Sequence, residues 1–299
     1  MKRCVSLMFN GSTRPANQNA ELLRGFGVDE TAITAQRHPF YDIEFEESDG
    51  RLSRMLEGLG RLRQSYIRKV WIEYDRHDLD AAPLLWLRQA SKTRGSPQPY
   101  SQYDLSAACP RCGTGAQLIG AMQIKANELS KKGGLQQCHT GEVIISESLA
   151  QAVKEETGSS IDFRPVEEYG TEVALPWRHI VPQFVLPPFA RETTGVLRER
   201  ACPSCNRDGY FGNIEVPFQP VFRQHDFREL QCWPRMEGAA PPDFARTWEC
   251  YGNSSLNLDN DPVKTIGFAQ PLIFVSNRVM RTVLRNKVRG FDFVPIRLL

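Results

Sequence analysis

Two pairs of cysteines, each pair separated by two residues, constrain this chain more than any other feature of its sequence. The pairs are Cys109-Pro-Arg-Cys112 and Cys202-Pro-Ser-Cys205. This spacing is typical of a zinc knuckle, in which two thiolates from one tight turn occupy two corners of a tetrahedron. Proline inside each turn fixes φ, and Gly113 and Asn206, which follow the second cysteines, tolerate a positive φ.

Together the two pairs supply four sulfur ligands, enough for one closed metal site. We predict one structural Zn2+ ion held by Cys109, Cys112, Cys202 and Cys205. All four corners of the tetrahedron would then be filled by the protein, which leaves no position for water or substrate. Because such an ion is bound by the folded chain only, its binding energy contributes directly to folding.

Other arrangements of the cysteines remain open. In one, each pair forms its own site, the first with Cys138 and His139 and the second with Cys232 and Cys250. In another, the thiols carry no metal. A thioredoxin-like redox role fits less well, because that chemistry needs a helix that begins directly after the strand and lowers the thiol pKa. The prolines inside both turns favour a knuckle instead.

Length and composition describe an ordinary globular protein. The chain has 299 residues, of which 41% are hydrophobic and 24% charged, enough for one large domain or two ordinary ones. The apolar run after Met1 is too short for a signal peptide, and no stretch approaches the roughly 18 apolar residues that span a bilayer. We therefore expect a cytoplasmic protein that does not engage a membrane. Eight cysteines in that compartment favour metal or thiols over disulfides.

Charge argues against a nucleic-acid surface built on bulk positive potential. The 37 basic and 35 acidic side chains leave a net charge of +2. One local basic cluster comprises Arg278, Arg281, Arg285, Lys287 and Arg289. We interpret it as the solvated face of a helix. The segment 205–211 combines a cysteine with Arg207, Tyr210 and Phe211 in the manner of a zinc ribbon, so nucleic-acid binding stays as an alternative.

Residues 1–100 are expected to form an N-terminal α/β segment. Hydrophobic periodicity predicts strands over residues 5–9, 42–46 and 67–74, and a helix over residues 51–64. A second, short helix is expected to begin at Asp78 and to carry Leu84, Leu85 and Leu87.

A weak internal repeat organises the rest of the chain. Residues 142–166 align without a gap on residues 272–296. The identical positions are Ser146 with Ser276, Val153 with Val283, Asp162 with Asp292, Phe163 with Phe293, and Pro165 with Pro295. Each copy predicts a short apolar strand, a serine that caps a helix, an amphipathic helix and a second strand.

The predicted helices each carry a buried stripe. The first stripe comprises Leu149, Ala152 and Val153, and the second comprises Val279, Met280, Val283 and Leu284. Since each copy follows a cysteine pair, we interpret residues 101–200 and 201–299 as two knuckle modules, the first including an extended crossing segment. The predicted fold class is α+β, with two strand–helix–strand modules joined by a zinc-ribbon-like pair of CxxC knuckles.

No pattern for nucleophilic or metal-dependent catalysis frames the five histidines. His179 is interpreted as a half-buried structural residue. Aromatic residues occupy loop-rich stretches, namely Trp177, Trp233, Trp248, Phe184, Phe189 and Phe227. Such residues either anchor a protein interface or fill the core of a chain short of regular structure.

Several segments together resemble the double-CXXCG family, known mostly from myxobacteria. The matching residues are 109–113, 202–211 and the C-terminal run from Phe274 to Pro295, and the similarity covers residues 105–299. The second pair departs from the family pattern, because Asn206 stands where the family has glycine. The resemblance implies zinc binding and, as for some members, a role as an immunity protein that protects the producing cell from a cognate toxin.

The sequence-based expectation is therefore a zinc-stabilised, non-catalytic protein that binds another protein. From the resemblance, we expect the partner to be a cognate bacterial toxin, which this protein would neutralise by binding to it directly. A zinc-ribbon nucleic-acid-binding protein and a metalloenzyme of unfamiliar pattern are the alternatives.

Overall fold

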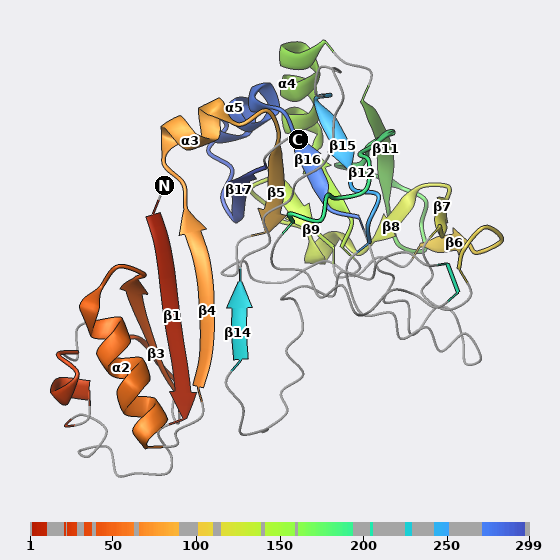
Figure 1. Cartoon of the computed structure of the whole chain (residues 1–299). Coiled ribbons are helices and arrows are strands. Elements are labelled where there is room, and N and C mark those ends of the chain that lie inside the picture. Colours follow the sequence, from red (N-terminus) through yellow and green to blue (C-terminus); the bar gives the residue numbers. More distant parts are fainter. Residues whose placement is uncertain are drawn as a thin grey trace. The chain divides into compact units, whose positions relative to one another are not determined.

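The fold was analysed in a computed structural model of the chain (Figure 1). The structure describes residues 2–10, 21, 23–28, 33–37, 40–62, 66–89, 101–109, 115–138, 141–158, 161–193, 204–205, 225–228, 242–250 and 271–296. The chain divides into two compact units. Unit 1 comprises Met1–Asp75 and Val216–Leu230, and unit 2 comprises Arg76–Glu215 and Gln231–Leu299.

Unit 1 is built on a five-stranded sheet in the order β14-β4-β1-β3-β2. Its strands are β1 (Lys2–Asn10), β2 (Ile33–Arg37), β3 (Phe40–Glu46), β4 (Tyr66–Glu73) and β14 (His225–Arg228). The central strand β1 is antiparallel to both β3 and β4, whereas β14 joins β4 in parallel. The strands expected at residues 5–9, 42–46 and 67–74 are therefore present; the first two are longer than predicted, and the third is shifted by one residue toward the N-terminus.

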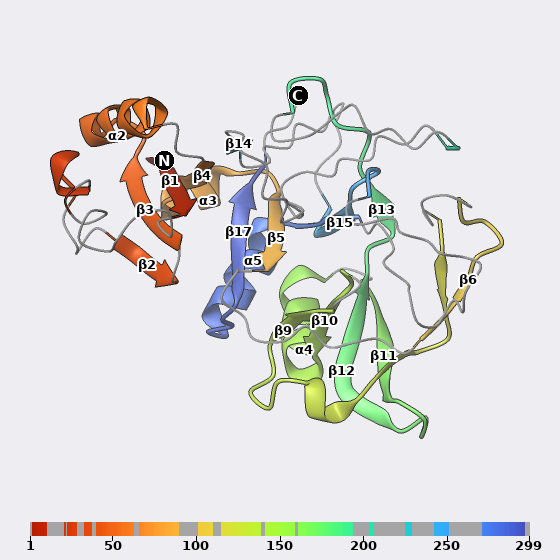
Figure 2. The ribbon, with the colours of Figure 1, turned by 90° about the horizontal axis from the view of Figure 1, so that it is seen from below.

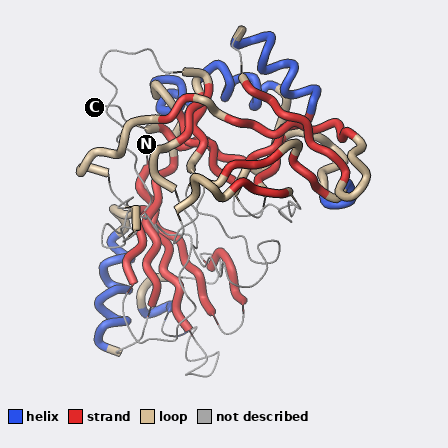
Figure 3. Tube along the Cα trace, turned by 90° about the vertical axis from the view of Figure 1, so that its right-hand side faces the viewer, coloured by secondary structure: helices blue, strands red, loops and turns tan. Residues whose placement is uncertain are grey.

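Helix α2 (Gly50–Arg61) lies against one face of this sheet (Figure 3). Its N-cap is Asp49, whose carboxylate accepts a hydrogen bond from the backbone N–H of Arg51 at 2.8 Å. Leu52, Met55 and Leu59 are buried in the core of unit 1. The helix ends three residues before the predicted residue 64, and Leu62 is 41% exposed because it lies beyond the last turn.

Unit 2 contains two further five-stranded sheets and a two-stranded one. The sheet orders are β8-β11-β12-β10-β9, β13-β15-β16-β5-β17 and β6-β7. The strands of the first sheet are β8 (Met122–Ile124), β9 (Leu135–Gln137), β10 (Val143–Ser146), β11 (Asp162–Glu168) and β12 (Ala174–Val181). Those of the second are β5 (Leu85–Gln89), β13 (Phe184–Val185), β15 (Phe244–Arg246), β16 (Ile273–Val275) and β17 (Phe291–Pro295). The small sheet pairs β6 (Gln102–Asp104) with β7 (Gln117–Ile119).

The helices of unit 2 are short. They are α3 (Arg76–Ala81), the 3-10 helix η2 (Ala126–Glu128), α4 (Glu147–Thr157) and α5 (Asn277–Arg285). None of the helices in the described part of the chain is both long and apolar enough to cross a bilayer. The mixture of several sheets with few helices agrees with the predicted α+β class.

The two aligned segments fold in the same way. Each forms a strand, a helix and a second strand, and in each a third strand lies between the two and runs antiparallel to both: β12 between β10 and β11 (Figure 2), and β5 between β16 and β17. The strand registers agree at the aligned positions: Ile144 and Arg164 pair with His179, and Phe274 and Val294 pair with Trp86.

The agreement extends to a fourth strand. β9 adds antiparallel to β10, and β15 adds antiparallel to β16. The backbone N–H of Ser146 donates to the carbonyl of Gly134 at 2.8 Å, and that of Ser276 donates to the carbonyl of Asp243 at 3.0 Å. Both bonds join the start of a helix to the residue before the neighbouring strand.

One hydrophobic core joins these two halves of unit 2. It takes Ile145 and Leu149 from the first half and Val275 and Val279 from the second. Helices α4 and α5 pack against each other above it (Figure 1). The rings of Phe163 and Phe244, one from each half, meet edge to face with centroids 6.2 Å apart. Neither half could bury its apolar stripe alone.

Two predicted stripes need correction at single positions. On α4 the buried residue is Ala150, whereas Ala152 is only partly buried. On α5 Leu284 is 38% exposed, and Thr282 takes its place in the core. Residues two positions apart are about 200° apart around a helix and lie on opposite edges of its buried stripe, so the packing partner decides which edge is buried.

The second predicted N-terminal helix is wrong in its C-terminal half. Helix α3 ends at Ala81, and Leu85 and Leu87 lie in strand β5. Because β5 fits between β16 and β17, residues 76–89 belong to unit 2, and the structural boundary falls at Asp75 rather than at residue 100. A run of leucines does not by itself distinguish a buried strand from a buried helix.

The segment between the halves is extended, as expected for a crossing segment. It contains β12 and then β13, which ends at Val185 before Pro187 and Pro188. Proline cannot donate to a strand ladder, which accounts for this end.

Candidate functional site

Two of the four predicted zinc ligands lie within the described residues. Cys109 is partly buried and Cys205 is exposed, whereas Cys112 and Cys202 lie outside the described part of the chain. The four-sulfur site therefore stays a prediction.

The surroundings of Cys109 have the geometry of a hairpin. Strands β6 and β7 pair antiparallel, with Asp104 opposite Gln117, so the first cysteine pair falls in the connection between them. Asp104 accepts a hydrogen bond from the backbone of Ser106 at 2.9 Å, which lowers the pKa of the Asp104 carboxyl. A connection between two paired strands is compatible with a zinc knuckle, in which two thiolates come from one short segment.

Gly115 brings the two sides of this connection together. Its φ is +101°, and a Cβ at this position would lie 2.6 Å from the carbonyl oxygen of Ala107. Only glycine allows both the left-handed backbone and this close approach. The chain on either side of residues 109–114 is thereby held side by side.

Cys138, a ligand in the two-site alternative, lies in the core. It is 2% exposed, and its Sγ is 3.9 Å from the Sδ of Met122. Burial raises the pKa of the Cys138 thiol well above its usual value, with Glu142 and Glu128 adding to the rise. These surroundings favour a neutral thiol packed among apolar groups. Of the remaining residues of that alternative, Cys250 is partly buried, and His139 and Cys232 lie outside the described residues.

His179 is more deeply buried than the half-buried residue expected from sequence. It is 7% exposed on β12, and its Nδ1 has no hydrogen-bond partner among the described residues. Burial lowers the pKa of His179 to about 4; the positive charge of Arg164 lowers it further, and Asp162 opposes the shift. The imidazole is therefore neutral near pH 7, in keeping with a structural residue.

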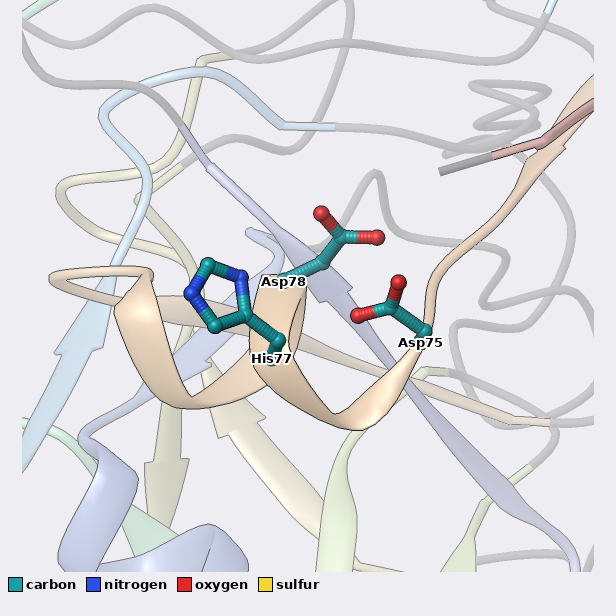
Figure 4. Close-up of side chains that lie close together, drawn as sticks. All are labelled: Asp75, His77 and Asp78. Atoms are coloured by element: carbon teal, nitrogen blue, oxygen red, sulfur yellow. The ribbon is translucent and has the colours of Figure 1, made fainter.

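A small cluster that sequence reasoning missed lies at the start of α3. The ligand atoms of Asp75, His77 and Asp78 lie within 4.8 Å of one another, with Asp75 and His77 exposed (Figure 4). Two carboxylates and an imidazole are donors that a divalent cation accepts. The sequence feature that could have indicated this cluster is the spacing Asp-x-His-Asp. Exposed acidic clusters of this kind are common without an ion.

The predicted basic face of α5 is engaged within the protein. Three of its arginines form ion pairs: Arg278 with Asp243 at 2.9 Å, Arg281 with Asp80 at 3.1 Å, and Arg285 with Glu156 at 3.1 Å. The acids come from three different parts of unit 2. Intramolecular partners therefore offset much of the positive charge that phosphates would otherwise meet.

The loop aromatics divide between core and surface. Trp177 is 3% exposed in the core beneath the first sheet, and Phe189 stacks on Phe274 with ring centroids 6.2 Å apart. Phe184, in contrast, is 40% exposed. Trp233 lies outside the described residues. For Trp177 and Phe189, filling the core is the correct interpretation.

Comparisons with known proteins identify no relative of this chain. No protein-family model, no curated protein and no solved structure matches the chain.

Proposed function

We propose that this chain is a zinc-stabilised, non-catalytic protein that binds another protein, and more specifically a cytoplasmic immunity protein that neutralises a cognate toxin by direct binding. The observation that carries the proposal is the shared strand register of residues 142–166 and 272–296. The second of these segments also carries the resemblance to the double-CXXCG family.

The shared register supports a duplicated module. Two unrelated strand–helix–strand pieces would be free to pair with a third strand in different registers and on different sides. Here the intervening strand, its direction and the residues that it faces agree at the aligned positions. We infer that unit 2 arose from two copies of one module that bury a common core.

The zinc ion would connect these copies. The β6–β7 hairpin and Gly115 support a knuckle at Cys109 and Cys112, and the second pair would complete the four sulfur ligands. When bound, the ion supplies a rigid crosslink and no chemistry, because no coordination position stays open.

A rigid scaffold of this kind suits inhibition by occlusion. An inhibitor that keeps its shape loses little conformational entropy on binding, which favours high affinity. Because three arginines of α5 already form ion pairs with carboxylates of the same chain, phosphate binding on that helix is disfavoured. Protein binding is therefore preferred over the nucleic-acid alternative.

Co-expression with the product of the neighbouring gene tests the proposal. We expect that product to be toxic alone, to be tolerated when this chain is co-expressed, and to copurify with it. Metal analysis should find one zinc per chain, and X-ray absorption should find four sulfur ligands. A harmless neighbour, or a toxic one that neither copurifies nor is tolerated, would contradict the immunity function.

A further inference from the structure

Strand β9 is the outer strand of its sheet. Among the described residues it pairs with β10 on one side and with no strand on the other (Figure 2). The N–H of Cys138 and the carbonyl of Gly134 point toward β10, where they bond to the backbone at 2.7 and 2.8 Å. Alternate residues of an antiparallel strand direct these groups to opposite sides, so the N–H and C=O of Leu135 and Gln137 point away from β10. We call this row of outward backbone groups the β9 edge.

The second half of unit 2 shows how the equivalent edge is used. Thr247 donates its N–H across the β15–β16 pair at 3.0 Å as Cys138 does across the β9–β10 pair, so Arg246 corresponds to Gln137. The carbonyl of Arg246 accepts a hydrogen bond from the N–H of Leu186 at 2.8 Å. Leu186 directly follows β13, which lies parallel to β15. The matching edge therefore holds a parallel strand.

The strand on β15 indicates what a strand on β9 should look like. Leu186, which donates the hydrogen bond, is 1% exposed, whereas Phe184 and Val185 are 40% and 41% exposed. An occupant of the β9 edge should therefore be extended and should carry an apolar side chain at the residue that donates to Gln137.

Positive charge surrounds the β9 edge. Lys131 and Lys132 are exposed just before β9. A Cβ on Gly134, the residue before β9, would lie 3.2 Å from Cγ1 of Val288, so the segment that follows α5 lies against the same end of the strand. Its exposed basic residues complete what we call the basic rim: Lys131, Lys132, Lys287 and Arg289. Within the described part of the chain these four side chains form no ion pair.

We propose that the β9 edge binds an extended acidic segment of the protein partner, which adds to the sheet parallel to β9. The outward backbone groups supply the hydrogen bonds of an added strand, and the basic rim selects acidic side chains. The inference rests on the proposed protein-binding function and names the surface and the chemistry through which the partner is recognised.

Other occupants fit less well. A second copy of this chain that paired β9 with β9 across a two-fold axis would place the strands antiparallel, unlike β13 on β15. Residues 91–93 stand in the sequence as far beyond β5 as residues 184–186 stand beyond β12, but they lie outside the described residues and include Lys92, which has the same charge as the basic rim. A nucleic acid would meet the basic rim but would not match the alternating donors and acceptors of the strand.

Fluorescence anisotropy of the full chain with a labelled peptide of four Val-Glu repeats tests the proposal. We expect binding, and we expect the amides of Leu135 and Gln137 to become protected from hydrogen exchange. N-methylation of the valines should weaken binding about tenfold, because the residue in the place of Leu186 donates to β9. N-methylation of the glutamates should leave the affinity unchanged.

A matched pair of variants tests the edge itself. Gln137→Pro removes an N–H that points away from β10, so the sheet is kept while docking weakens about tenfold. Gln137→Ala also loses the bond from the Gln137 side chain to the Gly141 carbonyl but keeps the N–H, and should bind like wild type. Thermal unfolding of both variants confirms that they fold, and the methylated peptides test the same bonds without any variant.

The basic rim is tested by a second matched pair. Lys131→Gln with Lys132→Gln should weaken the Val-Glu peptide about fivefold, because two charge pairs are lost. Arg24→Gln with Arg54→Gln removes two exposed arginines of unit 1 and should have no effect.

Several results would overturn the proposal. They are absence of peptide binding, equal loss for Gln137→Pro and Gln137→Ala, equal loss for the two methylated peptides, and equal loss for the two charge variants. An oligonucleotide that binds more tightly than the peptide and competes with it would assign the surface to nucleic acid. A dimer in light scattering that Gln137→Pro dissociates would assign the β9 edge to a second copy.

The β9 edge and the immunity function can fail separately. If the peptide binds as expected but no toxic partner copurifies, the β9 edge stands and the immunity function fails. If a toxic partner copurifies equally with wild type and with Gln137→Pro, the immunity function stands and the β9 edge fails as its binding surface.

Discussion

Single residues in this chain show how backbone and burial limit the choice of amino acid. Gly115 is required by its positive φ and by the approach of Ala107, and His179 is kept neutral by its surroundings. Sequence alone indicated that His179 was structural but underestimated its burial. It gave no sign of Gly115, because neither φ nor the distance to Ala107 is visible before the hairpin forms.

Gly115→Ala is predicted to destabilise unit 2 by about 3 kcal/mol, from a strained φ and a clash with the Ala107 carbonyl. Gly120→Ala is the matched control. Its φ is +70° with nothing within 4 Å of the added Cβ, so only the backbone cost of about 1 kcal/mol applies. Urea denaturation of both variants measures the difference, and equal losses would mean that the close approach is unimportant.

The low pKa of His179 makes stability depend on pH. The folded pKa of about 4 lies below the usual 6.5, so the unfolded chain binds the extra proton between these values and stability falls as pH is lowered from about 6.5 to 4. The loss from this residue is about 3 kcal/mol. His179→Gln should flatten the free energy of unfolding over this range relative to wild type. The exposed control His77→Gln should keep the wild-type slope.

At the scale of elements, the start of α5 joins the helix to β15. The Oγ of Ser276 accepts a hydrogen bond from the N–H of Val279 at 3.4 Å and donates to Asp243 at 2.6 Å. Asp243 is 8% exposed and also binds Arg278. The capping role of Ser276 was readable from sequence, whereas its bond to Asp243, 33 residues earlier, was not.

Ser276→Ala is predicted to cost about 1–2 kcal/mol, because the cap is lost and a buried carboxylate loses one donor. Ser148→Ala, near the start of α4, removes an exposed hydroxyl that lies 3.5 Å from the hydroxyl of Ser146, and should change stability by less than about 0.5 kcal/mol. Thermal unfolding of both variants provides the measurement. If Ser276→Ala leaves the thermal stability unchanged, the ion pair with Arg278 is by itself sufficient to stabilise the buried Asp243 carboxylate.

At the scale of the whole molecule, the chain consists of two units with separate cores. Zinc, in the proposed function, belongs to unit 2. Because structural zinc is linked to folding, loss of a ligand should affect that unit first. Unit 1 has its own sheet, helix and core and needs none of the predicted ligands.

Cys205→Ser is predicted to lose the ion and to unfold or aggregate the chain. Cys250→Ser serves as the comparison, since only the two-site alternative uses Cys250 as a ligand. Zinc content and solubility after purification distinguish the two arrangements. A Cys205→Ser protein with the solubility and thermal stability of wild type would show that the site is not structural, and loss of zinc in Cys250→Ser would favour two sites.

The sequence by itself determined the local structure: the first strands, the core face of α2, and the strand–helix–strand pattern of residues 142–166 and 272–296. These features follow from side-chain periodicity and caps within a few residues of each other. Only the tertiary structure decided that β5 joins unit 2, that β12 and β5 occupy matching places, and that Cys138 lies in the core. Those outcomes depend on which distant strand completes a sheet and buries an apolar face. The residues next to a strand in the sequence do not specify that pairing.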